Sequence, residues 1–201
     1  WMSLFATGRV ATVLNSGYIG QGPVVEEFER ELAKLTGTPN ILTTSSGTAA
    51  LDLALACLEV GPGDEVISTP MTCSATNHVI NNRGAQIVWA DIDPITGLIS
   101  PESVTRAITE RTKAVIVVDW GGESVKRELA LRRMDLPLII DSAHRSPTRD
   151  ERYSPTSNVF IAYSFQAIKF LTTGDGGALL VPEKHYKRAK LSRWFGLDRE
   201  S

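Results

Sequence analysis

Residues 41–58, ILTTSSGTAALDLALACL, decide the fold class that the sequence predicts. Residues 41–44 form a short apolar and β-branched run, which is typical of a strand, and residues 48–58 carry the apolar spacing of an amphipathic helix. Only the small residues Ser45-Ser46-Gly47 separate the two. A strand followed at once by a helix is the repeating unit of α/β folds.

The same alternation of strand and helix runs along the rest of the chain. The strand candidates are residues 41–44, 65–69, 86–90, 114–118, 138–141, 159–164 and 178–181. The helix candidates are residues 4–14, 24–35, 48–58, 74–82, 101–109, 124–134 and 183–195. We therefore expect an α/β fold, a three-layer α/β/α sandwich around a mostly parallel sheet of about seven strands.

The composition is that of a folded globular protein. The 201 residues are 42% hydrophobic and 22% charged, and 21 Lys and Arg against 23 Asp and Glu give a net charge of −2. This balance offers no basic excess for nucleic acid, and no apolar run reaches the length of a membrane span. The two cysteines, Cys57 and Cys73, make neither a disulfide framework nor a CxxC metal site. We expect a cytoplasmic protein with no metal, no nucleic acid and no membrane partner.

The first candidate site segment is Ser45-Ser46-Gly47-Thr48, where the helix 48–58 begins. Small residues at a helix N-terminus let backbone N–H groups approach an anion, and the helix dipole favours negative charge there. The hydroxyls of Ser46 and Thr48 could donate to phosphate oxygens. Simple helix capping explains the same residues, so the segment alone leaves both interpretations open.

The second candidate is Asp141, which ends the apolar run Leu138-Ile139-Ile140, with His144 three residues later. Open α/β sheets place their ligands at the carboxyl ends of strands. A buried carboxylate needs a cationic or hydrogen-bonding partner, and a protonated pyridine nitrogen is one such partner. A capping aspartate and a surface histidine are the alternative interpretation.

The third candidate is Lys169, which lies in the segment Phe165-Gln166-Ala167-Ile168-Lys169-Phe170. Apolar neighbours reduce the hydration of an amine, which lowers its pKa and favours the nucleophilic form. The glycines of Gly174-Asp175-Gly176-Gly177 permit a tight turn into the next strand. Most lysines are solvated surface groups, so this segment gains its meaning only in combination with the other two.

Together these segments resemble the DegT/DnrJ/EryC1/StrS family, the pyridoxal-phosphate (PLP) sugar aminotransferases of fold type I, from about Gly17 onward. The order and spacing of the matching motifs carry the resemblance, which implies an aspartate aminotransferase-like large domain. The motifs are Gly17-Tyr18-Ile19-Gly20-Gln21-Gly22-Pro23, Ser46-Gly47-Thr48-Ala49-Ala50-Leu51, Gly61-Pro62-Gly63-Asp64-Glu65-Val66-Ile67, Gly84-Ala85, Asp91-Ile92-Asp93, Asp141-Ser142-Ala143-His144, Ser164-Phe165 ahead of Lys169, Gly174-Asp175-Gly176-Gly177 and Arg193-Trp194-Phe195-Gly196.

The resemblance implies a role for each candidate residue. Lys169 would bind PLP covalently. Asp141 would pair with the pyridine nitrogen and keep it protonated, since a nearby negative charge favours the cationic form. His144 would touch the phenolic oxygen of the ring or the sheet edge near it. The phosphate would lie against the remaining candidates, Ser46, Gly47, Thr48 and Ser164, with a residue of a partner subunit completing that site.

The reaction implied by the resemblance is a transamination. An amino donor, L-glutamate, would pass its amino group by way of PLP to a nucleotide-linked keto-sugar, in amino-sugar and polysaccharide biosynthesis. Lysine at position 169 argues against the related sugar 3-dehydratases, which carry histidine there. The resemblance also implies a homodimer. The alternatives are a PLP-dependent synthase acting on a non-sugar cyclic ketone and a truncated PLP-binding domain without turnover.

Several features depart from the family pattern. Cys73 stands where many members have an aromatic residue stacked on the PLP ring, so it is either part of the cofactor site or a structural thiol. Segments 122–138 and 145–159 are shorter than usual. Family members are nearly twice this length. We therefore expect residues 1–22 to form an N-terminal helix and arm and residues 23–201 a PLP-binding large domain, with the C-terminal small domain absent from this chain.

Overall fold

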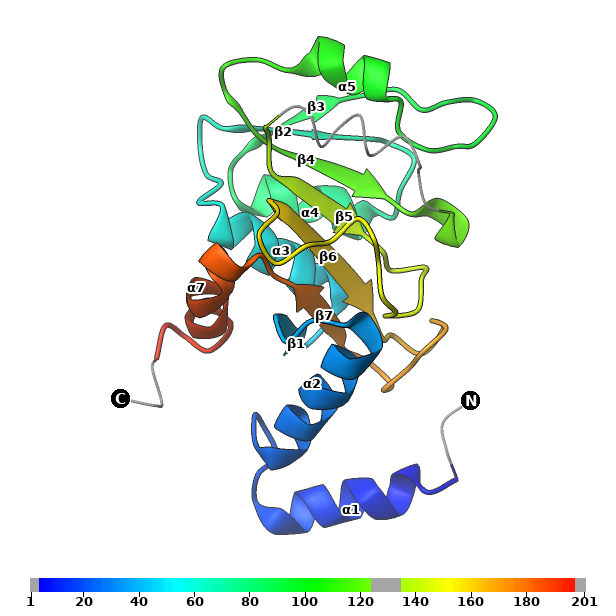
Figure 1. Cartoon of the computed structure of the whole chain (residues 1–201), viewed down its shortest axis with the longest axis vertical. Coiled ribbons are helices and arrows are strands. Elements are labelled where there is room, and N and C mark those ends of the chain that lie inside the picture. Colours follow the sequence, from blue (N-terminus) through cyan, green and yellow to red (C-terminus); the bar gives the residue numbers. More distant parts are fainter. Residues whose placement is uncertain (1–3, 124–134, 198–201) are drawn as a thin grey trace.

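The centre of the sheet is built from strands that are apolar on both faces. β4 (Thr112–Val118), β5 (Leu138–Asp141) and β6 (Val159–Ser164) are buried along almost their whole length. Such strands are typical of parallel sheets covered by helices. The computed structural model describes residues 4–123 and 135–197, and these three strands lie in the middle of one seven-stranded sheet (Figure 1).

The strand order is β1-β7-β6-β5-β4-β2-β3, completed by β1 (Ile41–Thr44), β2 (Glu65–Ser68), β3 (Gln86–Trp89) and β7 (Gly177–Leu180). All strands run in one direction except β7, which is antiparallel to both of its neighbours, β1 and β6. A Cβ on Gly177 would lie 2.4 Å from the Ser46 carbonyl group, so the start of β7 requires glycine. The expected mostly parallel sheet of about seven strands is confirmed.

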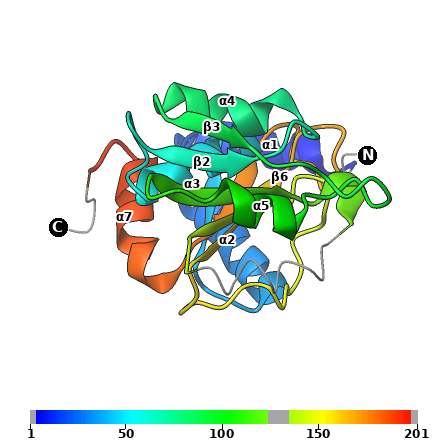
Figure 2. The ribbon, with the colours of Figure 1, turned by 90° about the horizontal axis from the view of Figure 1, so that it is seen from above.

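Helices cover both faces of the sheet, which confirms the expected three layers. α3 (Gly47–Cys57), α4 (Ser74–Asn82) and α7 (Glu183–Arg193) pack on one face. α2 (Pro23–Thr36) and α5 (Pro101–Ala107) pack on the other. Figure 2 shows α4 and α5 on opposite sides of β2. Successive strand residues pack on opposite faces of the sheet: Val66 packs in the core under α3, α4 and α7, and Ile67 packs in the core under α2 and α5.

Local signals set several of the helix ends. Ser100 caps α5 by accepting a hydrogen bond from the N–H of Ser103 at 3.2 Å, and Pro101 occupies the first helical position. α2 likewise begins at Pro23 and is followed by Gly37, whose φ of 74° is rarely adopted by residues with a Cβ. These signals are local in sequence, and the boundaries of the helices among residues 4–123 and 135–197 were predicted to within two residues.

α1 (Ala6–Ser16) lies apart from this core, beyond α2 in Figure 1, and has no buried residue. It begins and ends two residues later than the helix expected at 4–14. A short 3₁₀ turn, η1 (Trp120–Gly122), follows β4 and was not expected. The helix expected at residues 124–134 lies outside the described residues, and the division into an arm and a large domain stays a prediction. None of the described helices is long and apolar enough to cross a bilayer.

Candidate active site

A small cavity opens at the carboxyl ends of β4 and β5, the edge at which open α/β sheets hold their ligands. Four of the residues predicted from the sequence meet here. Cys73 immediately precedes α4. Asp141 is the last residue of β5 and His144 lies three residues later, and Lys169 lies in the loop after β6. The cavity has a volume of about 30 Å³ and is lined by Thr72, Cys73, Val118, Asp119, Trp120, Asp141, Ala143, His144 and Lys169.

The Asp141 carboxylate is the buried acid of this cavity. Its Oδ2 accepts a hydrogen bond from the Thr76 hydroxyl at 2.7 Å, and its Oδ1 accepts one from the backbone N–H of Ala143 at 3.1 Å. Burial raises the pKa of the Asp141 carboxyl, and the two hydrogen bonds together with the nearby His144 and Lys169 oppose that rise. A cation placed beside this carboxylate would stabilise its charged form.

His144 is an exposed side chain at the rim of the cavity. Its Nδ1 accepts a hydrogen bond from the backbone N–H of Gly121 at 3.1 Å, and its ring lies against Trp120 with the ring centroids 5.4 Å apart. An Nδ1 that accepts a hydrogen bond carries no hydrogen, so the neutral imidazole has its hydrogen on Nε2. η1 thus fixes the orientation of the ring and makes Nε2 a hydrogen-bond donor.

Lys169 is half-buried and lies in a loop whose turn is closed by a hydrogen bond from its backbone N–H to the Gln166 carbonyl at 2.8 Å. The apolar surroundings expected for its amine are only partly present. Phe165 is buried, but Ile168 and Phe170 are 84% and 88% exposed. The expectation that all three sequence neighbours desolvate the amine is therefore wrong for Ile168 and Phe170, whose side chains are exposed to solvent.

The two cysteines have different surroundings. Cys57 is buried in α3, and burial raises the pKa of its thiol to about 11. Cys73 is exposed and lines the same cavity as Asp141 and Lys169. Of the two interpretations left open for Cys73, the structure therefore favours a place at the candidate site over a thiol packed in the core.

Ser46, Gly47, Thr48 and Ser164 form a second group at the same edge of the sheet. A Cβ on Gly47 would lie 2.9 Å from the Ser164 Cβ, so glycine lets the N-terminus of α3 approach the end of β6. The Ser46 Oγ accepts a hydrogen bond from the Ala49 N–H at 3.0 Å, so Ser46 caps α3. Thr48 is exposed. None of these four residues lines the cavity of Asp141 and Lys169.

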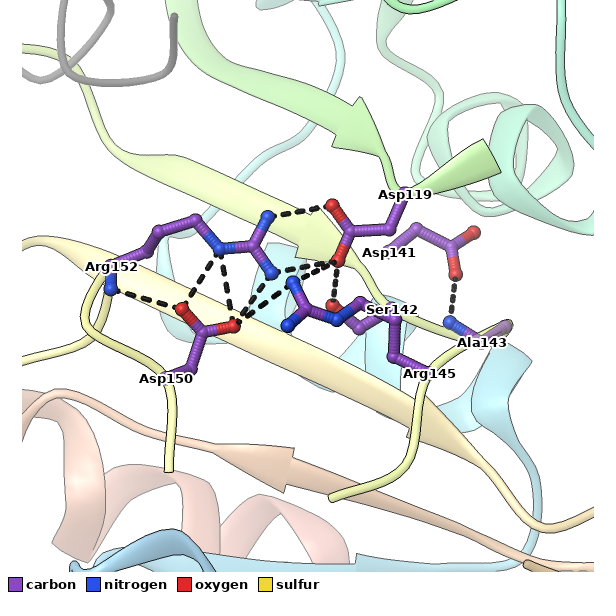
Figure 3. Close-up of polar contacts among 7 residues, drawn as sticks. All are labelled: Asp119, Asp141, Ser142, Ala143, Arg145, Asp150 and Arg152. Atoms are coloured by element: carbon purple, nitrogen blue, oxygen red, sulfur yellow. Dashed lines mark hydrogen bonds and ion pairs between the residues drawn. The ribbon is translucent and has the colours of Figure 1, made fainter. Parts of the chain in front are cut away.

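A charged cluster lies beside the strand that ends at Asp141 (Figure 3). Two nitrogens of Arg152 donate to the two carboxylate oxygens of Asp119 at 2.6 and 2.7 Å, and Arg152 also binds Asp150. Ser142 donates its hydroxyl hydrogen to Asp119 at 2.5 Å. In Figure 3 the Asp141 side chain points away from this cluster and toward Ala143. The alternation of side chains along an extended backbone separates the two neighbours, Asp141 and Ser142.

Sequence reasoning did not single out several polar or aromatic residues of this site, among them Thr72, Thr76, Asp119 and Trp120. Asp119 carried a usable signal, because it follows the apolar run of β4 just as Asp141 follows the apolar run Leu138-Ile139-Ile140. Thr76 carried none, since a threonine in the first turn of a helix is ordinary. Among residues 4–123 and 135–197, no group of three or more His, Cys, Asp or Glu side chains is arranged to hold a metal ion.

A much larger cavity has a volume of about 1110 Å³. It is bounded by α3, by α7 and by residues 19–21, which precede α2. Several of its charged side chains are paired. Arg83 binds Asp52 at 2.7 Å, and Arg193 binds Glu29. The smaller cavity is the better candidate for chemistry, because it combines a buried acid with a primary amine.

The residues of the small cavity fit PLP chemically. Asp141 is a buried acid that forms no ion pair with a lysine or arginine among the described residues, and Lys169 is an amine that can bind a carbonyl carbon. The N-terminus of α3, which Gly47 lets approach Ser164 at the end of β6, suits a phosphate. About 30 Å³ is the space of roughly one or two water molecules, so binding a ring requires the rim side chains, Cys73, His144 or Lys169, to move aside.

A mostly parallel sheet with an acid and a lysine meeting at its carboxyl edge defines the class of α/β enzymes that hold an organic cofactor at this edge. The chain belongs to the DegT/DnrJ/EryC1/StrS aminotransferase family, whose profile matches residues 4–201. This family is PLP-dependent.

The relatives include enzymes of sugar metabolism. Over 180 residues the chain is 40% identical to the spore coat polysaccharide biosynthesis protein SpsC of Bacillus subtilis (strain 168), covering 88% of this chain and 46% of SpsC. The sugar aminotransferase CalS13 from Micromonospora echinospora is 32% identical with a TM-score of 0.88, covering 100% of this chain and 58% of CalS13.

A third relative has been solved with its cofactor. The PLP-form of Spr1654 from Streptococcus pneumoniae is 32% identical with a TM-score of 0.86, covering 95% of this chain and 55% of Spr1654. A PMP-form of the same protein matches with a TM-score of 0.85. The chain thus spans about half the length of the relatives it matches.

Proposed function

We propose that the chain carries the cofactor site of a PLP-dependent aminotransferase that transfers the amino group of L-glutamate to a nucleotide-linked keto-sugar. The observation that carries this proposal is that Asp141 and Lys169 line one cavity at the carboxyl edge of the sheet. Membership of an aminotransferase family, and likeness to SpsC and CalS13, support a sugar acceptor.

In this proposal Asp141 and Lys169 divide the chemistry. Asp141 binds the ring nitrogen and keeps it protonated, because a carboxylate favours a neighbouring cation. PLP, when bound, supplies an electron-withdrawing ring that accepts the electron pair left at the donor's α-carbon. Lys169 would hold the cofactor, and its free amine would accept the proton from that carbon.

The remaining candidates would orient the cofactor. His144 presents Nε2–H as a donor to an oxygen of the ring, since Gly121 occupies Nδ1. Within the first turn of α3, the N–H groups of Ala49 and Ala50 are bound to Ser46 at 3.0 and 3.1 Å. Helix geometry leaves the earlier N–H groups, those of Gly47 and Thr48, for a phosphate. Ser164 lies beside them, and Cys73 lies at the rim near the ring.

We also propose that the site is completed by a second copy of the chain and works in the cytoplasm. Ile168 and Phe170 flank Lys169 and are 84% and 88% exposed. Exposed apolar side chains beside a site are typical of an interface. In such a homodimer the partner subunit covers Ile168 and Phe170 and contributes a residue to the phosphate site.

The test begins with absorption spectra of the purified chain mixed with PLP. The proposal predicts a visible band of lysine-bound cofactor in the wild type and its loss in the Lys169→Ala variant. Lys113→Ala is the matched control, since Lys113 lies in β4 and does not line the cavity. Absence of a Lys169-dependent band would overturn the proposal.

Substrates are then added to the loaded protein. L-glutamate should bleach the band, and a nucleotide-linked keto-sugar should restore it with formation of an amino-sugar. Restoration by a non-sugar cyclic ketone alone would indicate a synthase, and a band that no amino donor bleaches would indicate a PLP-binding domain without turnover. Either result would replace the proposed reaction while keeping the cofactor site.

A further inference from the structure

Thr76 reaches the candidate acid from a different layer of the fold. It lies in the first turn of α4 and is fully buried, and its hydroxyl is 2.7 Å from Oδ2 of Asp141. The two residues are 65 positions apart in the sequence. The helix that carries Thr76 begins just after Cys73, another residue of the cavity, so α4 supplies both the rim and the support of the site.

The hydrogens in this part of the site can be assigned. Thr76 has one hydroxyl hydrogen, and a carboxylate oxygen can only accept, so the hydrogen goes to Asp141. The Thr72 and Thr76 hydroxyl oxygens are 2.8 Å apart. Because the Thr76 hydrogen is already used, Thr72 must be the donor of that second bond. The chain of donation therefore runs from Thr72 to Thr76 to Asp141.

We propose that Thr76 is a positioning residue for Asp141: its hydroxyl hydrogen fixes the orientation of the carboxylate and holds it in the unprotonated form that a ring cation needs. Thr76 itself touches neither cofactor nor substrate in this proposal. The inference rests on the proposed function, because it assigns Asp141 the ring nitrogen as its partner.

The surroundings of Asp141 explain why one hydrogen bond matters. Oδ1 is fixed by the Ala143 N–H, and Oδ2 is fixed by Thr76. The titratable groups around the same cavity are Cys73, Asp119, His144 and Lys169. Burial disfavours the charged carboxylate, and removal of a donor from a buried group adds the cost of an unsatisfied acceptor. Without Thr76, Asp141 should therefore take up a proton more readily and rotate more freely.

The test compares Thr76→Val, which keeps the shape and removes the hydroxyl, with Thr76→Ser, which keeps the hydroxyl. Thr36→Val is the matched control, because it removes another buried helical hydroxyl, bonded to the Leu32 carbonyl at 2.8 Å. PLP dissociation constants and the pH midpoint of the lysine-bound band are measured for each. If Thr76→Val does not fold, Thr76→Ala, which adds no volume, takes its place.

We expect Thr76→Val to weaken PLP binding about tenfold, the size of one lost hydrogen bond to a charged group. Its pH midpoint should move upward, because a ring that has lost its nitrogen proton repels a proton on the lysine nitrogen less. Thr76→Ser and Thr36→Val should stay close to the wild type. Unchanged binding and midpoint in folded Thr76→Val, or a Thr76→Ser variant that behaves like Thr76→Val, would overturn the proposal.

A cofactor-free measurement separates this inference from the proposed function. The pKa of Asp141 can be followed by NMR of ¹³C-labelled aspartate, assigned by comparison with Asp141→Asn. Thr76→Val should raise that pKa relative to the wild type even if the chain never binds PLP. Failure of the Lys169 band alone would then reject the aminotransferase, whereas an unchanged Asp141 pKa would reject the role of Thr76.

Discussion

The backbone N–H of Asp119 donates to the carbonyl oxygen of Asp141 at 3.0 Å, so two buried acids stand at adjacent strand ends. Asp119 is held by Arg152, which donates to both of its oxygens. Asp141 receives only a hydroxyl and an amide hydrogen, and no ammonium or guanidinium among the described residues forms an ion pair with it. The chain compensates the charge of Asp119 itself, whereas Asp141 remains open to a cation supplied by a ligand.

The first prediction concerns the role of Asp141 in catalysis. Asn at this position keeps the shape of the side chain but cannot keep a ring nitrogen protonated. We expect the rate of the glutamate half-reaction in Asp141→Asn to fall by at least about 100-fold, the usual effect of removing one preorganised electrostatic partner. Stopped-flow absorbance of the PLP-loaded protein measures it, and a rate within threefold of the wild type would contradict the assignment.

The same substitution should stabilise the cofactor-free protein at neutral pH. Burial raises the pKa of Asp141 in the folded state, so folding with this group ionised costs free energy. The cost is absent below the ordinary value of 3.8, grows as the pH rises toward the raised pKa, and is complete above it. Urea unfolding at several pH values should therefore show Asp141→Asn more stable than the wild type at pH 7, with no gain at pH 3. A stability loss at pH 7 would reject this account.

The close approach of α3 to β6 predicts a cost for a single methyl group. In Gly47→Ala the new Cβ would lie 2.9 Å from the Ser164 Cβ, so one of the two segments must shift. Overpacking of this kind costs about 1–3 kcal/mol of unfolding free energy. Gly61→Ala is the control, since a Cβ there meets nothing within 4 Å. Equal stabilities of the two variants in urea would show that the contact between α3 and β6 is not tight.

The charged cluster predicts a large effect for a small change at Asp119. Asp119 is fully buried and the side chain of its partner Arg152 is 12% exposed. Asp119→Asn leaves the Arg152 guanidinium with one carboxylate fewer, and breaking a buried pair from one side costs about 3–5 kcal/mol. Glu31→Gln is the control, because the Glu31–Lys34 pair at 2.6 Å is exposed on α2 and such pairs contribute about 0–1 kcal/mol. Similar losses of unfolding free energy in the two variants would show that the Asp119–Arg152 pair contributes no more to stability than an exposed ion pair.

Acid stability should depend on Glu65. Hydrogen bonds from Thr109 at 2.5 Å and Arg111 at 2.9 Å lower the pKa of the Glu65 carboxyl below its ordinary value of 4.5. A lowered folded-state pKa contributes stability that is complete above the ordinary value and is lost as the pH falls through the folded value. Glu65→Gln should therefore lose stability at pH 7 and differ less from the wild type in strong acid. The exposed Glu110→Gln serves as control, and a pH-independent difference would contradict the prediction.

Much of the fold could be predicted from the sequence because local properties of the chain mark its strands and helices. Short local patterns predict the elements: an apolar run predicts the strand that ends at Asp141, small residues predict the start of α3, and glycines predict the turn after Lys169. Asp141 could be singled out because it ends a buried strand at the edge where parallel sheets bind ligands, and Lys169 because of its apolar sequence neighbours and the glycine turn after it. That edge is a property of the fold class, so it follows once the alternation of strand and helix is recognised.

Tertiary structure decided the contacts between segments that carry no mark of each other. The antiparallel place of β7 between β1 and β6, the hydrogen bond from Thr76 to Asp141 and the pairing of Arg152 with Asp119 join residues that are distant in sequence. The tertiary structure also decided that Ile168 and Phe170 are exposed, which their apolar character did not predict. Such contacts depend on how whole layers pack, and packing selects among many pairings that the local hydrophobic period leaves equivalent.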